Sequence, residues 1–201
     1  LLMLLYGIGW RRQEGFSVPV NYRPAVSISV IIPARNEADN IASCIESALA
    51  QDYPKELYEI IVVDDHSTDD TARIIQSFQG VRYINLADYV HDKEQVTAYK
   101  KRALATGIAQ SKGDLIVTTD ADCTAGSQWL KTIAARYEQE KPVMIVSPVD
   151  FTTGKGLAQV FQSLDFMSMQ GITAATLQLK LGNMCNGANL AFLKTAYEQV
   201  G

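Results

Sequence analysis

Short β-branched runs alternate with segments of helical periodicity between residues 26 and 146. Five runs have the composition of buried strands, at residues 26–32, 60–63, 81–86, 115–119 and 143–146. Four segments repeat their apolar residues at helical spacing, at residues 41–49, 72–78, 96–109 and 127–137. Strands and helices that alternate at these lengths form a mainly parallel sheet with helices on both faces. The sequence therefore predicts an α/β fold of the Rossmann-like type.

Polar residues and prolines mark the ends of these predicted elements. Pro33 is expected to end the first strand, since proline cannot donate to a strand ladder. Asn36 or Asn40 is expected to cap the first helix, and Ser67 or Thr68 the second.

The pattern changes after Pro148. Residues 154–181 are rich in Met and Phe, which predicts an amphipathic or irregular segment. Packing in the core is the ordinary role of such residues, and contact with a membrane surface or an acceptor substrate is the alternative. Residues 185–192 have the pattern of a turn that leads into a further strand.

The N-terminal residues 1–10 are apolar, and they are followed by Arg11 and Arg12. Ten residues are too few to span a bilayer. Trp10 followed by two arginines is nevertheless typical of the cytoplasmic end of a membrane helix, and the alternative is a short helix packed on the domain. We therefore expect residues 1–24 to be a membrane-helix remnant with a linker, and residues 25–201 to form one domain.

Composition excludes several classes of function. The 201 residues are 47% hydrophobic and 20% charged, as in one globular domain with a sizeable core. The net charge of -4 and the lack of a basic stripe argue against a nucleic-acid partner. Cys44, Cys123 and Cys185 have unrelated spacings, so we expect reduced thiols rather than disulfides or a zinc site.

Three polar clusters directly follow predicted strands, at residues 33–37, 64–69 and 120–122. The carboxyl ends of parallel strands meet at one edge of a sheet, and ligands bind beyond that edge. We therefore expect the three clusters to form one binding site.

Asp120 and Asp122 form the most informative of these clusters. Residues two apart in an extended chain point to the same side, so both carboxylates can face one point. Two carboxylates at that distance repel each other unless a cation lies beside them, and a hard divalent cation is the usual partner. The pair predicts a metal site whose open coordination positions take phosphate oxygens.

The other two clusters suit a nucleotide. Two consecutive aspartates, Asp64 and Asp65, are more than a helix cap requires, so we expect one of them to accept a hydrogen bond from a uracil imide or a guanine edge. The residues 33–37 fit turn and helix-start chemistry, and they also fit a loop that lines a nucleotide pocket. Glu37 is expected to accept from the base or the ribose.

A basic run lies on the third predicted helix. Most such runs are solvated, but Ala103, Leu104 and Gly107 are expected to pack this helix on the sheet. We expect either Lys100 or Lys101 to reach a diphosphate, where a cation stabilises the charge of the leaving group.

Together these stretches resemble the family 2 inverting glycosyltransferases, which have the GT-A fold, in their membrane-associated bacterial form. The matching segments are residues 30–37, 62–69, 100–104, 119–122 and 186–192. Each segment is modest alone, but the order and spacing of all five are specific.

The resemblance implies a nucleotide-sugar donor, with a UDP-sugar favoured, and a glycan or lipid-linked acceptor. Asp120 and Asp122 would hold Mg²⁺ or Mn²⁺, a Lewis acid for the leaving nucleoside diphosphate. Three further residues, Asn186, Gly187 and Asn189, would lie on the acceptor side. The implied setting is cell-envelope polysaccharide or glycolipid synthesis on the cytoplasmic face of the bacterial inner membrane. The nucleotide-sugar site would comprise Pro33, Arg35, Glu37, Asp64, Asp65, Lys100, Lys101, Asp120, Ala121 and Asp122.

The catalytic base is not assigned. In the family it usually belongs to an acidic pair after the acceptor-side strand, and no such pair follows Phe192. Glu198 has the pattern of an exposed helix residue, and Asp150 and Asp165 are candidates only by elimination. We therefore expect a fragment that stops before the base motif. The alternatives are a non-catalytic nucleotide-sugar-binding module and a nucleotidyltransferase, although residues 33–37 lack the glycines of the latter.

Overall fold

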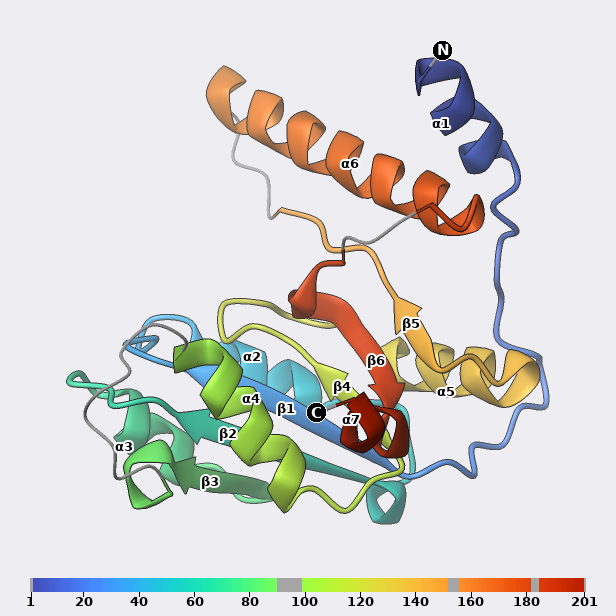
Figure 1. Ribbon diagram of the computed structural model, residues 1–201. Helices are drawn as coiled ribbons and strands as arrows, with labels where there is room; N and C mark the ends of the chain where they lie inside the picture. Colours follow the sequence, from blue (N-terminus) through green and yellow to red (C-terminus); the bar gives the residue numbers. More distant parts are fainter. Residues whose placement is uncertain (1, 90–98, 152–155, 182–184, 201) are drawn as a thin grey trace. The chain divides into compact units, whose positions relative to one another are not determined.

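The computed structural model of the chain describes residues 2–89, 99–151, 156–181 and 185–200. The chain divides into two compact units (Figure 1). The sheet unit consists of Val18–Ile145 with Gly187–Gly201, and the helical unit consists of Leu1–Ser17 with Val146–Asn186. The N-terminal segment is thus grouped with residues much later in the sequence. The domain boundary expected between residues 24 and 25 stays a prediction.

A six-stranded sheet in the order β3-β2-β1-β4-β6-β5 forms the centre of the sheet unit. The pairs β1–β2, β2–β3 and β1–β4 are parallel, and β6 runs antiparallel to β4. This mainly parallel sheet confirms the predicted fold class. The strands are β1 (Ile28–Ala34), β2 (Tyr58–Asp64), β3 (Val81–Asn85), β4 (Leu115–Thr118), β5 (Met144–Val146) and β6 (Leu190–Leu193).

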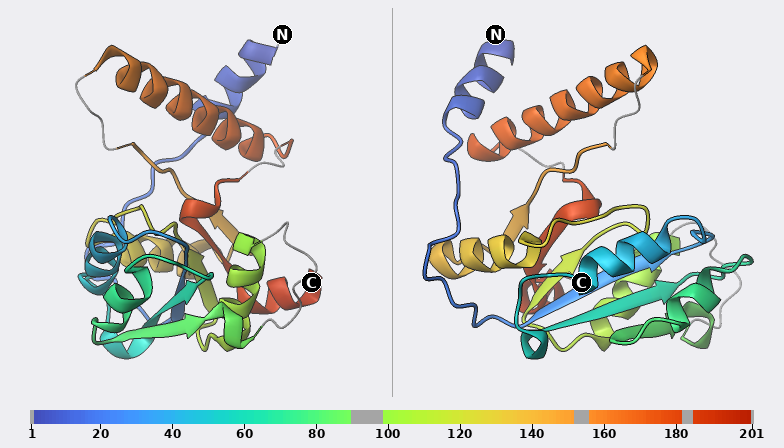
Figure 2. Two further views of the ribbon diagram at one scale, coloured as in Figure 1. Left: turned by 90° about the vertical axis from the view of Figure 1, so that its left-hand side faces the viewer. Right: turned by 180° about the vertical axis from the view of Figure 1, so that it is seen from behind.

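Helices cover both faces of the sheet. The left view of Figure 2 shows α2 and α4 on opposite sides of the strands. One apolar core lies under α2, α3 and α5, and a second lies under α4 and α7. The helices are α2 (Ile41–Leu49), α3 (Thr71–Gln76), α4 (Tyr99–Gln110), α5 (Trp129–Glu140) and α7 (Lys194–Val200), with 3₁₀ turns η1 (Lys55–Leu57), η2 (Leu86–Asp88) and η3 (Gly187–Asn189). Residues 96–98 of the third predicted helix lie outside the described residues.

The alternation of side chains along β1 separates the two cores. Val30 and Ile32 belong to the first core and Ile31 to the second, and all three are fully buried. On the second face α4 lies very close to the sheet at Gly107, where a Cβ would come within 2.6 Å of Cγ2 of Ile31. This contact accounts for a glycine in the middle of a helix, and it bears out the expected packing of α4.

Strand β1 does not end at Pro33, as the sequence had suggested, but continues through Ala34. Pro33 pairs in register with Val63 of β2. The carbonyl of Ile31 accepts a hydrogen bond from the N–H of Thr119, which directly follows β4. Pro33 lies two residues further along β1, so the nitrogen of Pro33 also faces the β4 side. Pairing with β4 has already ended at Ile31 and Thr118, so the missing N–H interrupts no ladder.

The helical unit contains α1 (Leu2–Arg11) and the long helix α6 (Leu157–Gln178). The two helices cross closely at Gly9, where a Cβ would overlap the backbone of Ala175. Two side-chain amides fasten the crossing: Gln13 Nε2 donates to Ala174 O at 2.6 Å, and Gln178 Nε2 donates to Arg12 O at 3.0 Å. Among the described helices, none combines the length and apolar character needed to cross a bilayer.

Candidate functional site

A cavity of about 300 Å³ opens at the carboxyl ends of β1 and β4. The chain places β2 and β3 on one side of β1 and β4 on the other, so the strand order reverses between β1 and β4. Such a reversal leaves a crevice beyond the strand ends, where ligands of open α/β sheets bind. Eight of the ten predicted donor-site residues line this cavity: Pro33, Arg35, Glu37, Asp65, Lys100, Asp120, Ala121 and Asp122.

Asp120 is held in the turn that follows β4. Its Oδ1 atom lies 2.5 Å from Nζ of Lys100, which α4 brings from the neighbouring side of the cavity. Its backbone carbonyl accepts from the N–H of Cys123 at 3.1 Å and from the thiol of Cys44 at 3.5 Å. Hydrogen bonds to the carbonyl therefore fix the backbone of Asp120, and the ammonium of Lys100 compensates the charge of its carboxylate.

Asp122 is more exposed than Asp120 and has a different partner. The Sγ atom of Cys123 lies 3.6 Å from its Oδ1 atom. The thiol of Cys44 lies beneath this turn, and the nearby carboxylates affect its pKa. Burial is the main reason why its pKa rises to about 12, and nearby Asp122, Asp120 and Glu37 act in the same direction. Burial followed by Asp122 likewise raises the pKa of Cys123.

The donor set suits a hard cation with few protein ligands. Asp120 and Asp122 supply carboxylate oxygens at an open cavity, and one oxygen of Asp120 already forms an ion pair with the ammonium of Lys100. Within the described part of the chain, no group of three or more His, Cys, Asp or Glu side chains is arranged to hold a metal. The metal site expected at Asp120 and Asp122 stays a prediction, and an ion held there would need further ligands such as phosphate oxygens and water.

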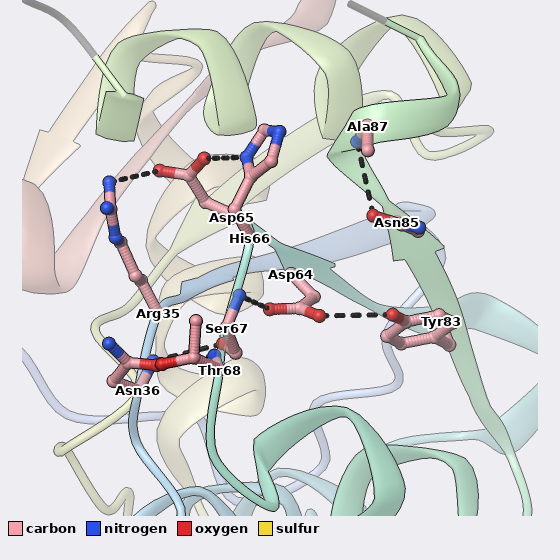
Figure 3. A network of polar contacts seen from close by, with 10 residues as sticks. All are labelled: Arg35, Asn36, Asp64, Asp65, His66, Ser67, Thr68, Tyr83, Asn85 and Ala87. Carbon is pink, nitrogen blue, oxygen red and sulfur yellow. Dashed lines mark hydrogen bonds and ion pairs between the residues drawn. The ribbon is translucent and has the colours of Figure 1, made fainter. Parts of the chain in front are cut away.

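Asp65 is the member of the aspartate pair that lines the cavity. Its side chain is only 5% exposed, and Figure 3 shows it between Arg35 and His66. Nδ1 of His66 lies 2.8 Å from Oδ1 of Asp65, and NH1 of Arg35 lies 3.8 Å from Oδ2. The guanidinium of Arg35 also lies over the ring of Tyr99, 4.4 Å from its centroid. This arrangement places a carboxylate, a guanidinium and an aromatic ring on one wall.

Asp64 has a structural role. Its Oδ1 accepts from the N–H of Ser67 at 3.1 Å, and its Oδ2 accepts from the hydroxyl of Tyr83 at 3.1 Å (Figure 3). Burial, together with the charge of Asp64 and this hydrogen bond, raises the pKa of Tyr83 to about 12. Both oxygens of Asp64 thus hold the β2–α3 loop to β3, and the question of which aspartate faces the cavity is answered in favour of Asp65.

The loops after β1 and β2 are joined by side-chain hydrogen bonds. Oδ1 of Asn36 accepts from the N–H of Thr68 at 2.8 Å, and the N–H of Asn36 donates to Ser67 Oγ at 3.0 Å. Asn36 and His66 both have left-handed backbones, with φ of 54° and 58°. Asn36, Ser67 and Thr68 therefore connect two loops instead of capping helices, whereas Asn40 does occupy the N-cap position of α2, without a side-chain cap bond. At the start of α3 it is Asp69 that accepts from the N–H of Thr71 at 3.0 Å, and the Thr71 hydroxyl lowers the pKa of Asp69.

The remaining predicted residues lie elsewhere. Lys101 is exposed on α4, next to Lys100 but outside the set of residues that line the cavity. Gly187 O accepts from the hydroxyl of Thr118 at 2.7 Å, and Oδ1 of Asn189 accepts from Nε1 of Trp129 at 2.9 Å. These two residues thus attach the turn before β6 to β4 and α5. Asn186 belongs to the helical unit, and the acceptor-side role of all three stays a prediction.

Sequence reasoning missed Tyr99, the thiol of Cys44 beneath the turn and the thiol of Cys123 next to Asp122. Tyr99 directly precedes Lys100, so its place on the helix that carries Lys100 was the available signal. Cys44 shares the apolar face of α2, and nothing in its spacing links it to Asp120. Its contact with the Asp120 carbonyl arises only from the packing of α2 against β4.

The profile of the family described as glycosyl transferase family 2 matches residues 29–201. The chain is 33% identical over 176 residues to glycosyltransferase AglE of Haloferax volcanii, an alignment that covers 87% of this chain and 55% of AglE. It is 35% identical over 116 residues to a dolichyl N-acetyl-alpha-D-glucosaminyl phosphate 3-beta-D-2,3-diacetamido-2,3-dideoxy-beta-D-glucuronosyltransferase of Methanococcus voltae, covering 57% of this chain and 35% of that protein.

Solved structures show the same fold. The mannosyltransferase PcManGT from Pyrobaculum calidifontis, in complex with GDP-Man and Mn²⁺, superposes with a TM-score of 0.72 at 23% identity, covering 100% of this chain and 54% of PcManGT. Glucosyl-3-phosphoglycerate synthase of Mycobacterium tuberculosis gives a TM-score of 0.57 at 24% identity, covering 85% of this chain and 58% of that one. These are GT-A glycosyltransferases, as predicted for this chain.

The chain spans only about half the length of these relatives: its alignments cover 55% of AglE and 54% of PcManGT. The profile match nevertheless extends over more than half of the chain, and it includes every residue that lines the cavity. The protein belongs to glycosyl transferase family 2.

Proposed function

We propose that this chain is the donor-binding part of an enzyme that transfers a sugar from a nucleotide-sugar to an acceptor hydroxyl with inversion. The observation that carries the proposal is the cavity at the β1–β4 reversal, which gathers Asp120, Asp122, Lys100, Asp65 and Arg35. Glycosyltransferase relatives and the GT-A fold support the class of reaction. The acceptor oxygen forms a bond to the anomeric carbon while the bond from that carbon to the diphosphate breaks, and the hydroxyl proton passes to a carboxylate base outside the assigned residues.

The diphosphate end of the donor is assigned to the Asp120-Ala121-Asp122 turn. Asp120 and Asp122 would hold Mg²⁺ or Mn²⁺, which supplies Lewis-acid stabilisation of the leaving nucleoside diphosphate. Lys100 supplies a fixed ammonium beside the same turn. Because its partner carboxylate would be shared with the cation, the ammonium is placed to contact phosphate oxygens. The Mn²⁺ in the PcManGT complex agrees with the use of a divalent ion.

The nucleoside end is assigned to the wall formed by Asp65, Arg35 and Tyr99. Asp65 has a fixed carboxylate that can accept from the imide N–H of uracil, and the Arg35 guanidinium over Tyr99 offers a flat cationic surface for a base. We favour a UDP-sugar as the donor. TarS of Staphylococcus aureus has been solved with UDP-GlcNAc, and PcManGT with GDP-Man, so relatives of this fold take different bases.

The acceptor is proposed to be a glycan or a lipid-linked molecule of a cell-envelope polysaccharide or glycolipid pathway, used at the cytoplasmic face of the bacterial inner membrane. The apolar N-terminus with Arg11 and Arg12 supports membrane association. Asn186, Gly187 and Asn189 remain assigned to the acceptor side.

Titration calorimetry with UDP, GDP and dTDP, each with and without Mn²⁺, tests the proposal. We expect one nucleoside diphosphate to bind with micromolar affinity, and binding to weaken at least about tenfold when the metal is removed. If none of the three binds at millimolar concentration in the presence of Mn²⁺, the assignment of the cavity is wrong.

A further inference from the structure

One side of helix α6 packs against residues 149–151 of the helical unit, and the opposite side is exposed. On the inward side, Nε2 and Oε1 of Gln170 bond to the backbone of Val149, and the ring of Phe166 lies 4.5 Å from that of Phe151. Residues 149–151 of the helical unit therefore pack against the face of α6 that carries Phe166 and Gln170. Amphipathic helices in globular proteins ordinarily bury their apolar stripe, so this orientation calls for a partner on the other face.

The opposite face of α6 carries a stripe of large apolar side chains spaced at one to three residues. Each is 45% exposed or more, and Leu157 and Phe161 are 91% and 72% exposed. Core packing, the ordinary role of such residues, thus holds for only one side of this helix. The stripe consists of Leu157, Val160, Phe161 and Leu164, with Met167 at its edge, where Met167 also lines a cavity with Val149 and Gln170.

Helix α1 lies on the continuation of this stripe. Gly171 and Ala175 follow Leu164 and Met167 around the same side of α6, and they are the residues that contact Trp10 and Gly9 of α1. Apart from Gly9 and the half-buried Tyr6, α1 is exposed, including Leu2, Met3, Leu4 and Ile8. The two helices therefore share one continuous apolar surface, which we call the apolar helix pair: residues Leu2–Trp10 with the stripe of α6.

The described cationic side chains of the helical unit lie at one end of this surface. α1 contains one charged residue, Arg11, and the one charged residue of α6 is the exposed carboxylate Asp165, in the middle of that helix. Arg11, Arg12 and Lys180 are all exposed near the crossing of the two helices, because Gln178 of α6 bonds to Arg12. Glu14 is the exposed carboxylate beside them, so this end is locally basic although the whole chain has a net charge of -4.

We propose that the apolar helix pair inserts into the headgroup region of an anionic lipid bilayer, with Arg11, Arg12 and Lys180 at the phosphates. This inference rests on the membrane association in the proposed function, and it assigns that association to α6 as well as to the N-terminus. An apolar face with a basic edge matches an interfacial helix, for which buried apolar area and attraction to anionic lipid both contribute. The exposed Trp10, beside the arginines, occupies the position of an interfacial aromatic.

Flotation of the 201-residue chain with vesicles tests the proposal. Vesicles of phosphatidylcholine with about a third phosphatidylglycerol are compared with pure phosphatidylcholine. We expect the chain to float with the anionic vesicles and more weakly with the neutral ones. Replacement of both Arg11 and Arg12 by Gln should lower partitioning about fivefold per charge on anionic vesicles and leave partitioning on neutral ones unchanged.

The contribution of α6 is tested by a double variant, Phe161→Ser with Leu164→Ser. Both side chains are more than half exposed, so the fold tolerates the change. We expect partitioning to fall about tenfold or more, because two large apolar groups no longer enter the bilayer. The matched control is Val143→Ser with Val200→Ser, which removes exposed apolar groups from the sheet unit and should change nothing.

Tryptophan fluorescence gives an independent readout. Trp10 is 59% exposed whereas Trp129 is bonded to Asn189, so vesicles should shift the emission to the blue in the unmodified chain but not in Trp10→Phe. Failure to float with either vesicle, or equal partitioning of the α6 variant and the unmodified chain, overturns the inference. So does sedimentation that shows a dimer which the α6 variant abolishes. Nucleotide calorimetry on the same samples separates this outcome from failure of the donor site.

Discussion

Nζ of Lys100 lies 2.5 Å from Oδ1 of Asp120, so the cation of α4 and the carboxylate after β4 form one unit at the cavity. Lys101, one residue further along the same helix, is exposed and lines no part of that cavity. The two lysines therefore offer a matched pair. They differ in position by one residue and share the same chemistry, so a difference between their variants reports on the cavity alone.

We predict that Lys100→Met weakens UDP binding about tenfold, because an ammonium beside the diphosphate contributes one charge-assisted hydrogen bond. Lys101→Met should bind UDP as the unmodified chain does. Calorimetry with UDP and with uridine is the measurement, and uridine affinity should be unchanged in both variants. Equal losses in the two variants would mean that the effect is one of net charge and not of position.

Asp122→Asn should remove the dependence of UDP binding on Mn²⁺. The carboxylate is exposed at the cavity and its partner is the weak donor Cys123, so the substitution leaves the turn intact and removes a proposed metal ligand. We expect affinity in Mn²⁺ to fall about tenfold or more, toward the value without metal. The control is Asp70→Asn, which changes an exposed carboxylate that directly precedes α3 and is paired with Arg73. An unchanged difference between the two conditions would remove Asp122 from the metal site.

The neighbouring aspartates Asp64 and Asp65 should separate in their effects. Asp65→Asn should reduce discrimination between UDP and CDP, because the carboxylate that faces the cavity is lost. Asp64→Ala should instead lower the free energy of unfolding by about 1–3 kcal/mol, since Ser67 N–H and Tyr83 hydroxyl lose their acceptor in a buried place.

Calorimetry with both nucleotides and thermal unfolding measure the two effects. If the unmodified chain already binds UDP and CDP equally, the base-reading role of Asp65 fails. A large loss of stability in Asp65→Asn with no change in Asp64→Ala would reverse the assignment of the pair.

Periodicity was sufficient to predict the strands and most helices, because buried β-branched runs and helical apolar spacing reflect the same two cores that the fold contains. The position of Asp120 and Asp122 beyond β4 followed from their place directly after the apolar run at residues 115–119. Pro33 was misjudged because its effect depends on which neighbour its nitrogen faces, and that is a property of the sheet.

The division of labour between Asp64 and Asp65 could not be read from the sequence. Asp64 ends β2 and Asp65 follows it, and successive side chains point to opposite faces. Only the position of Tyr83 on β3 decides which carboxylate makes a structural hydrogen bond. The same holds for Tyr99, whose ring gains its role from Arg35 on another element. A pattern of residues along the chain does not show which distant segments come into contact, so these roles could not be predicted from it.

The bond between the two site loops predicts a stability effect at Asn36. Its left-handed backbone and its side-chain bond to Thr68 both suit asparagine. Asn36→Ala should cost about 1–2 kcal/mol, and Asn36→Gly should cost less, because glycine adopts positive φ without strain. Asn36→Asp keeps the acceptor oxygen and should remain close to the unmodified chain. Urea unfolding measures all three, and an Asn36→Gly variant less stable than Asn36→Ala would contradict the backbone argument.

The three thiols should differ in reactivity. Burial, reinforced by the nearby carboxylates, raises the pKa of Cys44 to about 12, so at pH 8 this thiol stays neutral, whereas Cys185 is exposed. A shift from the ordinary 9.0 to about 12 lowers the thiolate fraction about a thousandfold. Iodoacetamide followed by peptide mass spectrometry should therefore label Cys185 first, then Cys123, and Cys44 last.

The same shift fixes the sign of a pH effect. The thiol of Cys44 ionises more readily in the unfolded chain, so its contribution to stability is complete below pH 9 and is lost as the pH rises toward about 12. Tyr83, whose pKa is also raised to about 12, acts in the same direction above pH 10. Urea midpoints should thus fall between pH 9 and pH 11, and Cys44→Ala should show a shallower fall than the unmodified chain. A parallel decline in both would show that Cys44 does not ionise differently in the folded protein.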